Sequence, residues 1–450
     1  MTGLARRIDP GLRRLRAAAV TVAATLASFG TAALLAHYAG LTTSFVILAV
    51  ALAVTLGRPG QQGATRQRGL LGLLVVPVIA AGASEVGRQM ADHPNLGDTL
   101  FVLAAAGTIF LRRFGPRAVR IGTLATLPLI TTLIVPAPVV ADGGGWAGRA
   151  WSALIAVVVL GWVSAAELVA HRFRVLPRPE PVLPVPRPKS SRRLPASTRM
   201  AVQMAVALTA AFVVGRTYYP AHWTWVVLTA FIVCSGNRGR GDVLGKGIMR
   251  VAGAAAGTLA ATALTGVFPP GDRWCVVAIF AVLGVGLWLR QLNYAYWAAA
   301  MTAALALLYG YFGQAGSGLL DDRLTEIVVG AVLGIAASWL VLPVRSTDVL
   351  RRDLSVALAA LADCLGTEAS AEHHARFRQA VAALDRPGLT LPLTARRPAL
   401  VALRRCVAAA PDGLTDAGLA DTVTDLRRGL GSRRLPDPAA WSELADRVPG

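Results

Sequence analysis

Long apolar stretches recur throughout the first 345 residues, and this recurrence limits what the chain can fold into more than any other feature. A helix that crosses the hydrocarbon core of a bilayer needs about 20 mainly apolar residues, fewer where interfacial residues complete it. By that measure the sequence holds two sets of stretches, at 17–36, 41–57, 69–88, 98–111, 119–138 and 150–171, and at 200–217, 221–236, 248–267, 274–289, 293–312 and 324–343. They predict an all-α integral membrane protein with about 12 transmembrane helices in two six-helix halves.

Composition and charge agree with a membrane protein. Hydrophobic residues make up 54% of the chain, charged residues only 16%, and the mean hydropathy is +0.54, outside the usual balance of a soluble globular protein. The net charge of +20 comes from the apolar part, because Lys and Arg nearly balance Asp and Glu in 346–450. No polar domain with a nucleic-acid-binding motif carries this charge, so we expect the lipid bilayer, and no nucleic acid, as a partner.

A proline-rich segment separates the two sets of apolar stretches. The sequence RFRVLPRPEPVLPVPRPKSSRRLPAS, which begins at residue 172, holds too many prolines for a helix and is typical of a stiff spacer. After residue 345 no further membrane-length stretch occurs, and apolar residues stand at helical spacing with arginines opposite. The predicted division is therefore a membrane half at 1–171, a cytoplasmic linker at 172–199, a second membrane half at 200–345 and a cytoplasmic helical region at 346–450.

Lys and Arg are distributed unevenly between the two sides of the predicted spans. With the N-terminus in the cytoplasm, most basic residues of the loops fall on the cytoplasmic side. The opposite side keeps only Arg88, Arg149, Arg216, Arg273 and Arg323. This bias predicts a multi-pass protein of the cell membrane with both termini in the cytoplasm.

The two halves resemble each other at an offset of 180 residues. HYAGLTTSFVILAVALAVTLGR (37–58) aligns with TYYPAHWTWVVLTAFIVCSGNR (217–238), and in each a turn precedes a short apolar stretch that ends in a basic loop. With six helices each, the halves run in the same direction, which indicates a parallel repeat about an axis along the membrane normal.

The second of these segments gathers aromatic and ionisable residues at one end. Arg216, His222, Trp223 and Trp225 stand close together on the predicted extracytoplasmic side. Amphipathic rings are favourable at the level of the lipid headgroups, so these residues can form an interfacial belt. The alternative is that they line the outer mouth of a pathway through the membrane.

Further polar residues are candidates for the same pathway. Arg250 can extend to the cytoplasmic headgroups or face inward toward an anion. Arg290, Tyr294, Tyr296 and Thr302 place hydrogen-bond donors and aromatic faces on a helix of otherwise small residues.

Two pairs of ionisable residues have both a structural and a functional explanation. Arg323 and Glu326 are three residues apart at a helix start and can simply pair. Glu167 and His171, four apart, can form a proton relay or a helix-end contact near water.

No arrangement typical of catalysis is present in the sequence. It contains no nucleophile–base pair, no paired carboxylates and no metal-ligand spacing, and its four cysteines stand far apart, as buried apolar residues would. The segment GRGDVLGKG lacks the residues that a phosphate-binding loop needs before and after its Gly-Lys pair. We therefore expect no enzyme, catalytic residue, metal or cofactor.

The second half resembles the fusaric acid resistance protein-like family of integral membrane transporters. Three features carry the resemblance: the tryptophan-bearing helix at 221–236, the Arg250-x-x-Gly253-x-x-x-Gly257 entry, and an Arg-led last helix with Gly330 and Gly334. The four glycines predict close helix packing. The resemblance is good over about 200–345 and faint over 17–171.

This resemblance implies export of small aromatic carboxylates or related toxic anions across the inner membrane. Arginines near helix ends can bind carboxylates and aromatic side chains can stack on a ligand ring. The candidates for the substrate path are Arg216, His222, Trp223, Trp225, Arg250, Arg290, Tyr294, Tyr296, Thr302 and Arg323.

Three functions remain open at this point. The first is a secondary exporter in which a proton gradient drives alternating exposure of a site between the two halves. The second is a passive anion channel, dimeric or otherwise homo-oligomeric, favoured by the scarcity of acidic residues within the spans. The third is a membrane scaffold that does not transport and binds a partner through its cytoplasmic tail.

Overall fold

The structure is a computed structural model that describes residues 9, 12–57, 65–134, 146–177, 194–263, 267–311, 317–366, 370–384, 393–409, 417–431 and 435–448. Within these ranges all regular secondary structure is helical and no strand occurs. The chain divides into two compact units. The first unit comprises Met1–Glu180, Pro195–Gly236 and Lys246–Leu342, and the second comprises Pro181–Leu194, Asn237–Gly245 and Pro343–Gly450.

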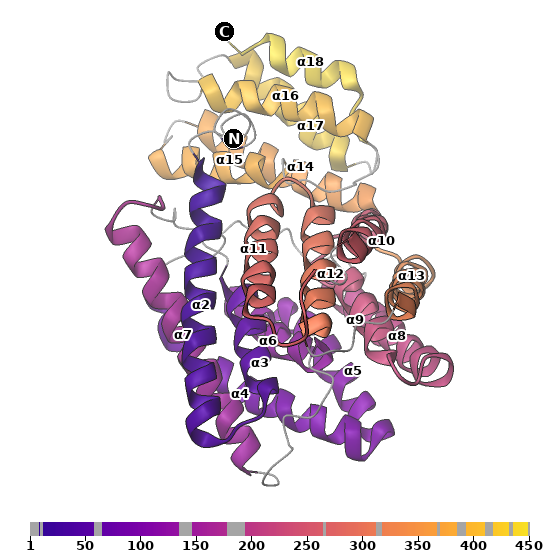
Figure 1. Cartoon of the computed structure of the whole chain (residues 1–450). Helices are drawn as coiled ribbons and strands as arrows, with labels where there is room; N and C mark the ends of the chain where they lie inside the picture. The colour runs from indigo at the N-terminus through magenta and orange to yellow at the C-terminus, as the bar shows by residue number, and fades with distance from the viewer. Residues whose placement is uncertain are drawn as a thin grey trace. The chain divides into compact units, whose positions relative to one another are not determined.

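The first unit contains the helices of both apolar sets (Figure 1). The first set is α2 (Arg13–Ala39), α3 (Thr43–Leu56), α4 (Thr65–Asp92), α5 (Pro94–Phe110), the short η2 (Leu111–Phe114), α6 (Pro116–Ile134) and α7 (Trp146–Arg172). The second set is α8 (Ala196–Tyr218), α9 (Trp223–Cys234), α10 (Arg240–Ala263), α11 (Arg273–Leu289), α12 (Tyr294–Tyr311) and α13 (Ser317–Leu340). The first residues of α10, up to 245, belong to the second unit.

Each predicted span coincides with one of these helices, yet not all of the helices are both long and apolar enough to cross a membrane. Six meet that condition by length and composition: Arg13–Ala39, Pro94–Phe114, Arg117–Ile134, Trp146–Arg172, Ala196–Tyr218 and Asp322–Leu340. Thr43–Leu56, Trp223–Cys234 and Arg273–Leu289 are apolar but shorter. The all-helical class is confirmed, and the arrangement of 12 spans stays a prediction. Residues 135–138, 264–266 and 312 of the predicted spans and 178–193 of the linker lie outside the described residues.

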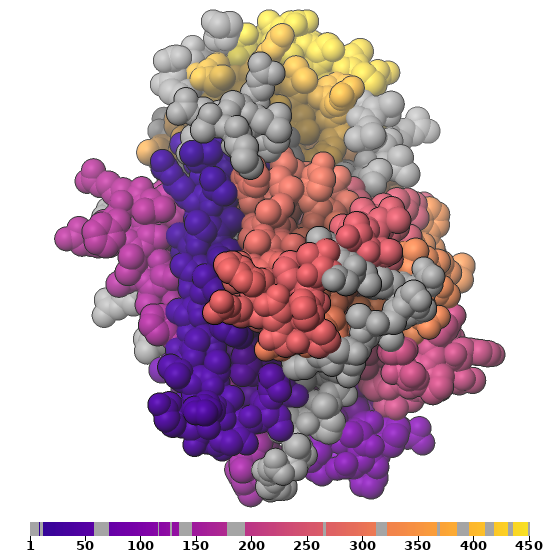
Figure 2. All heavy atoms as spheres, viewed as in Figure 1, coloured from indigo at the N-terminus to yellow at the C-terminus, as the bar shows by residue number. Residues whose placement is uncertain are grey.

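Helices of the two sets pack against one another inside the first unit. Phe101 of α5 contacts Phe212 of α8 and Phe231 of α9, with ring centroids 5.8 and 6.0 Å away. Phe29 of α2 meets Phe280 of α11 edge to face at 5.2 Å, and Figure 2 shows the spheres of α2 (indigo) against those of α11 (coral). The core of this unit is therefore built from both sets.

The short helices α3 and α9 occupy matching places in the sequence. Their first residues, Thr43 and Trp223, stand at the offset of 180 residues at which the two segments align. Both helices are apolar on all sides, and half of the residues of α3 and most of those of α9 are buried. A helix without a polar face is stable only when it is surrounded by other helices or lipid, as these two are.

Large apolar side chains also point outward from the first unit. Leu74 and Val78 of α4, Leu259 of α10 and Leu340 of α13 are each at least 71% exposed. Apolar surface of this extent is unfavourable in water but is solvated by hydrocarbon. This surface fits a bilayer environment.

The second unit has its own core. Its helices are α14 (Ser346–Leu365), α15 (Ala371–Leu384), α16 (Leu393–Ala409), α17 (Ala417–Gly431) and α18 (Pro438–Asp446). Leu354, Leu358, Phe377, Leu403 and Trp441 are fully buried in one apolar cluster. Among the described residues of 346–450, Val401 is the one large hydrophobic side chain that is exposed. This distribution is typical of a domain in contact with water.

The segment before α10 is attached to this second core. Arg238 pairs with Asp353 of α14 at 2.9 Å and donates to the carbonyl of Ala383. The backbone N–H of Gly241 donates to the hydroxyl of Ser346. These bonds explain why residues 237–245 belong to the second unit, although the rest of α10, which follows them, belongs to the first unit.

Candidate functional site

The aromatic end of α9 forms the centre of the candidate site. The chain turns through Tyr219 to His222, and α9 begins at Trp223 with α8 and α13 packed against it. Trp225 is 5% exposed and part of the core, whereas His222 and Trp223 are only partly buried. Indole rings at the start of this helix thus lie beside two charged side chains that reach them from α8 and α13.

Arg323 of α13 reaches the ring of Trp225. It is 2% exposed, and its guanidinium carbon lies 4.9 Å from the centroid of Trp225 and 3.9 Å from that of Tyr309 on α12. Its Nε and Nη2 atoms are buried without a hydrogen-bond partner. Contact with aromatic faces stabilises a cation, but it leaves these two nitrogen atoms unpaired.

Glu326 lies one turn further along α13. It is 1% exposed, its Oε2 has no hydrogen-bond partner, and its Oε1 is 3.8 Å from Nδ1 of His222. No hydrogen bond or ion pair within 4.0 Å joins Glu326 to Arg323 among the described contacts, although the two charges still interact electrostatically. We call Trp225, Tyr309, Arg323, Glu326 and His222 the Arg323 cluster.

Arg216 of α8 has a different environment although it also lies over a tryptophan. Its guanidinium carbon is 4.2 Å from the centroid of Trp223. Nε and Nη2 donate to the two carboxylate oxygens of Asp98 on α5 at 2.5 and 2.7 Å, and Nη2 also donates to the carbonyl of Met90 at 3.2 Å. A bidentate pair of this kind satisfies the guanidinium, so Arg216 joins α5 to α8.

The remaining path candidates lie toward the other end of α12. Arg250 of α10 is 4% exposed with Nε unpartnered, and Lys246, one turn earlier, lies 5.6 Å from the ring centroid of Tyr294. Arg290 donates to the carbonyl of Gly57 at 3.2 Å, and Tyr296 is half exposed. These residues are not part of the Arg323 cluster.

Thr302 lies on α12 between the Arg323 cluster and the candidates near Tyr294. The length of α12 sets the distance between these two groups of residues. Thr302 is buried and donates to the carbonyl of Ala298 within its own helix at 3.0 Å. Tyr294 and Tyr309 are 15 residues apart on α12, which corresponds to about 22 Å along a helix axis. The ten path candidates therefore do not converge on one point.

The four glycines lie where helices approach closely. A Cβ on Gly253 or Gly257 of α10 would meet backbone atoms of α12, at Ala295 and Ala299 respectively. On α13, a Cβ on Gly330 would meet the carbonyl oxygen of Val226, and one on Gly334 would lie 3.3 Å from Sγ of Cys234. The absent side chains allow α13 to lie against α9, which brings Arg323 to Trp225.

The relay expected between Glu167 and His171 stays a prediction. Glu167 is buried at 5% exposure on α7. Nδ1 of His171 is buried without a hydrogen-bond partner, and no described hydrogen bond or ion pair joins the two side chains.

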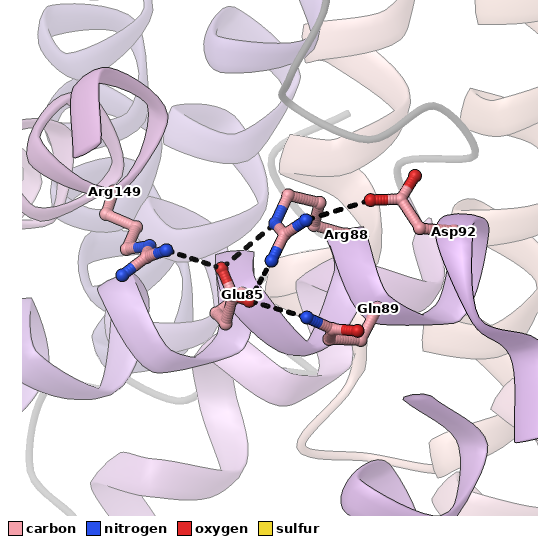
Figure 3. A network of polar contacts seen from close by, with 5 residues as sticks. All are labelled: Glu85, Arg88, Gln89, Asp92 and Arg149. Atoms are coloured by element: carbon pink, nitrogen blue, oxygen red, sulfur yellow. Dashed lines mark hydrogen bonds and ion pairs between the residues drawn. The ribbon is translucent and has the colours of Figure 1, made fainter. Parts of the chain in front are cut away.

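A second polar network is formed by residues that the sequence analysis did not single out (Figure 3). Glu85 of α4 accepts hydrogen bonds from Arg88 and Gln89 and pairs with Arg149 of α7 at 3.1 Å, while Arg88 also pairs with Asp92 at 2.9 Å. All its charges are matched, so this network joins α4 to α7 rather than offering a binding group.

Asp98 and Tyr309 were also missed. The sequence could have indicated Asp98, because an acidic residue inside an apolar helix needs a partner. Tyr309 gave no such signal, since an aromatic residue near the end of a span is ordinary. Among the described residues, no group of three His, Cys, Asp or Glu side chains could hold a metal ion.

Fold and site together define a multi-pass helical membrane protein. A model of the fusaric acid resistance protein-like family matches residues 204–337, which run from α8 into α13 and include Trp225, Arg250 and Arg323. The family resemblance is thereby confirmed for this part of the chain, which is less than half of its length. Neither the curated proteins nor the solved structures contain a match to the chain.

Proposed function

We propose that the chain is a secondary transporter of the cell membrane that exports small organic anions, aromatic acids foremost, and that Arg323 binds their anionic group. In this proposal two six-helix halves, 1–171 and 200–345, span the membrane with both termini in the cytoplasm. The Arg323 cluster then faces the extracytoplasmic side, as the distribution of loop charges predicts.

The observation that carries the proposal is the unsatisfied state of Arg323. A guanidinium that is 2% exposed, with Nε and Nη2 unpartnered and no described carboxylate paired to it, is costly unless an anion completes it. The planar array of N–H groups on an arginine matches a carboxylate through two parallel hydrogen bonds. A small organic acid supplies such a group.

The rings beside Arg323 support an aromatic ligand. Trp225 and Tyr309 lie against the guanidinium at 4.9 and 3.9 Å. A carboxylate bound to Arg323 brings its own ring close to these side chains, where aromatic pairs gain about 0.5–1.5 kcal/mol beyond buried area. We therefore expect aromatic acids to move faster than acetate.

Export of an anion needs no nucleotide-driven step. A membrane potential that is negative inside favours outward movement of a monovalent anion by about 2.3 kcal/mol per 100 mV. The second group of basic residues, which includes Lys246, Arg250 and Arg290, adds positive charge that attracts anions toward the opposite end of α12.

The test is flux in liposomes that contain the purified full-length chain. Uptake and release of 4-hydroxybenzoate, benzoate and acetate are followed with an imposed pH gradient, with an imposed voltage, and with neither. Arg323→Met should lower the flux of the aromatic acids at least about tenfold. Arg273→Met, which removes an exposed arginine at the start of α11, should leave it intact. Size-exclusion profiles of the variants show whether they fold.

Each result distinguishes between the functions. Uphill movement under a pH gradient establishes a coupled transporter. Flux that runs only downhill with voltage establishes a passive channel with the same anion site. If no acid moves under any condition, or if Arg323→Met and Arg273→Met behave alike, the proposal is wrong.

A further inference from the structure

Glu326 is a buried carboxyl group that the anion site alone does not explain. It lies one turn after Arg323, is 1% exposed, and has no hydrogen-bond partner at Oε2. Its Oε1 is 3.8 Å from Nδ1 of His222, which is beyond hydrogen-bond distance. A carboxylate in this position has no donor to stabilise its charge, so the surrounding charges decide whether it binds a proton.

The charged and titratable groups around Glu326 come from four helices and the turn before α9. They are Asp322 and Arg323 on α13, His222 before α9, Tyr309 on α12, and Arg216 on α8, which Asp98 of α5 neutralises. Arg323 is thus the fixed cation beside Glu326, and it can balance one negative charge.

We propose that Glu326 binds a proton from solvent when an anion binds at Arg323, an inference that rests on the proposed function of Arg323. In the empty site the Glu326 carboxylate balances the guanidinium. An arriving monoanion places a second negative charge next to the first in a region shielded from water, where like charges repel strongly. Protonation of Glu326 to the neutral acid removes that repulsion.

The linkage is reciprocal. An anion that raises the proton affinity of Glu326 requires that a proton on Glu326 raises the affinity of Arg323 for the anion by the same factor. The proton and the anion therefore bind this site cooperatively.

His222 provides a path for this proton. Its side chain is 34% exposed, and its Nδ1 faces Oε1 of Glu326. An imidazole has two nitrogen atoms that can each bind a proton, so it can transfer one between solvent and the buried carboxyl group. His222 therefore sets the rate of proton entry, whereas Glu326 sets the binding equilibrium.

The test measures proton uptake on anion binding by the purified full-length chain. Benzenesulfonate is the probe, because it stays fully ionised between pH 5 and 8 and does not titrate itself. Calorimetry in two buffers of different ionisation enthalpy gives the number of protons taken up per anion. We expect uptake of up to one proton, and a dissociation constant that rises by up to about tenfold per pH unit once Glu326 is ionised in the empty site.

Variants locate the proton. Glu326→Gln, which resembles the protonated acid, should bind benzenesulfonate without proton uptake and with the same affinity at every pH. His222→Gln should keep the proton uptake at equilibrium. If His222→Gln loses the uptake and Glu326→Gln keeps it, the proton resides on the histidine and the inference about Glu326 is overturned.

If Glu326→Gln fails to fold, the wild-type protein alone still tests the linkage between proton uptake and anion binding. Benzenesulfonate binding without proton uptake at any pH between 5 and 8 overturns the linkage but leaves Arg323 as an anion site. Absence of benzenesulfonate binding, or binding that survives in Arg323→Met, overturns both the linkage and the proposed role of Arg323.

Discussion

Two arginines of the first unit lie over two tryptophans of the same helix, yet their surroundings differ. Arg216 is 4.2 Å from the ring centroid of Trp223 and is held by both oxygens of Asp98. Arg323 is 4.9 Å from the ring centroid of Trp225 and has two unpartnered nitrogen atoms. An arginine over an aromatic ring is therefore not in itself evidence of a ligand site. Arg323 differs because no described carboxylate forms a hydrogen bond with its Nε and Nη2.

The largest expected effect is on stability, at the paired arginine. Asp98→Asn leaves the Arg216 guanidinium without its counter-charge between α5 and α8, and we expect the free energy of unfolding to fall by about 3 kcal/mol. The measurement is unfolding of the detergent-solubilised protein by a denaturing detergent.

Asp92→Asn is the matched control for that change. Asp92 also pairs with an arginine, Arg88, but its side chain is 50% exposed, so its loss should cost at most about 1 kcal/mol. Equal losses for the two variants would show that the Asp98 pair does not join the helices as described.

The next effect is on transport, at the unpaired arginine. Arg323→Met should lower the initial rate of 4-hydroxybenzoate flux by at least about tenfold, the equivalent of one charge-assisted hydrogen bond. Its free energy of unfolding should stay within about 1 kcal/mol of the wild type, because the change removes a desolvated charge and Glu326 can then take up a proton.

Arg216→Met should clearly lower the free energy of unfolding, because Asp98 then lacks its partner. It should leave the flux of 4-hydroxybenzoate largely unchanged. The comparison of the two arginines fails if Arg323→Met destabilises the protein as much as Arg216→Met does. In that case Arg323 would have a structural role.

The smallest effect separates the two tryptophans. A phenyl ring binds a cation less strongly than an indole, so Trp225→Phe should weaken benzenesulfonate binding about two- to fivefold by loosening the hold on Arg323. Trp223→Phe should leave the dissociation constant unchanged, since Trp223 supports the paired arginine. Calorimetric titration of both variants checks this, and a larger effect at Trp223 would place the anion near Arg216 instead.

The helices of the first unit could be predicted from the sequence because their signal is local. Apolar length marks a membrane helix whatever its neighbours are, and each predicted span coincides with a helix. The offset of 180 residues likewise anticipated that α3 and α9 begin at corresponding positions, Thr43 and Trp223.

The side-chain partners could not be predicted in the same way. Whether Arg216 meets an anion or Asp98 depends on α5 lying beside α8 and on the rotation of both helices about their axes, which no local pattern records. Arg323 and Glu326 stand at a spacing that allows an ion pair. The guanidinium turns instead toward Trp225 and Tyr309 on neighbouring helices.

The pair between Asp98 and Arg216 has a consequence for the order in which the protein is made. The two residues are separated by 118 positions. At a synthesis rate of about 5 to 20 residues per second, the carboxyl group exists for about 6 to 24 s before its guanidinium is made. During that interval α5 carries an acid without its partner, so the first half of the protein completes its assembly only after α8 has followed it into the membrane.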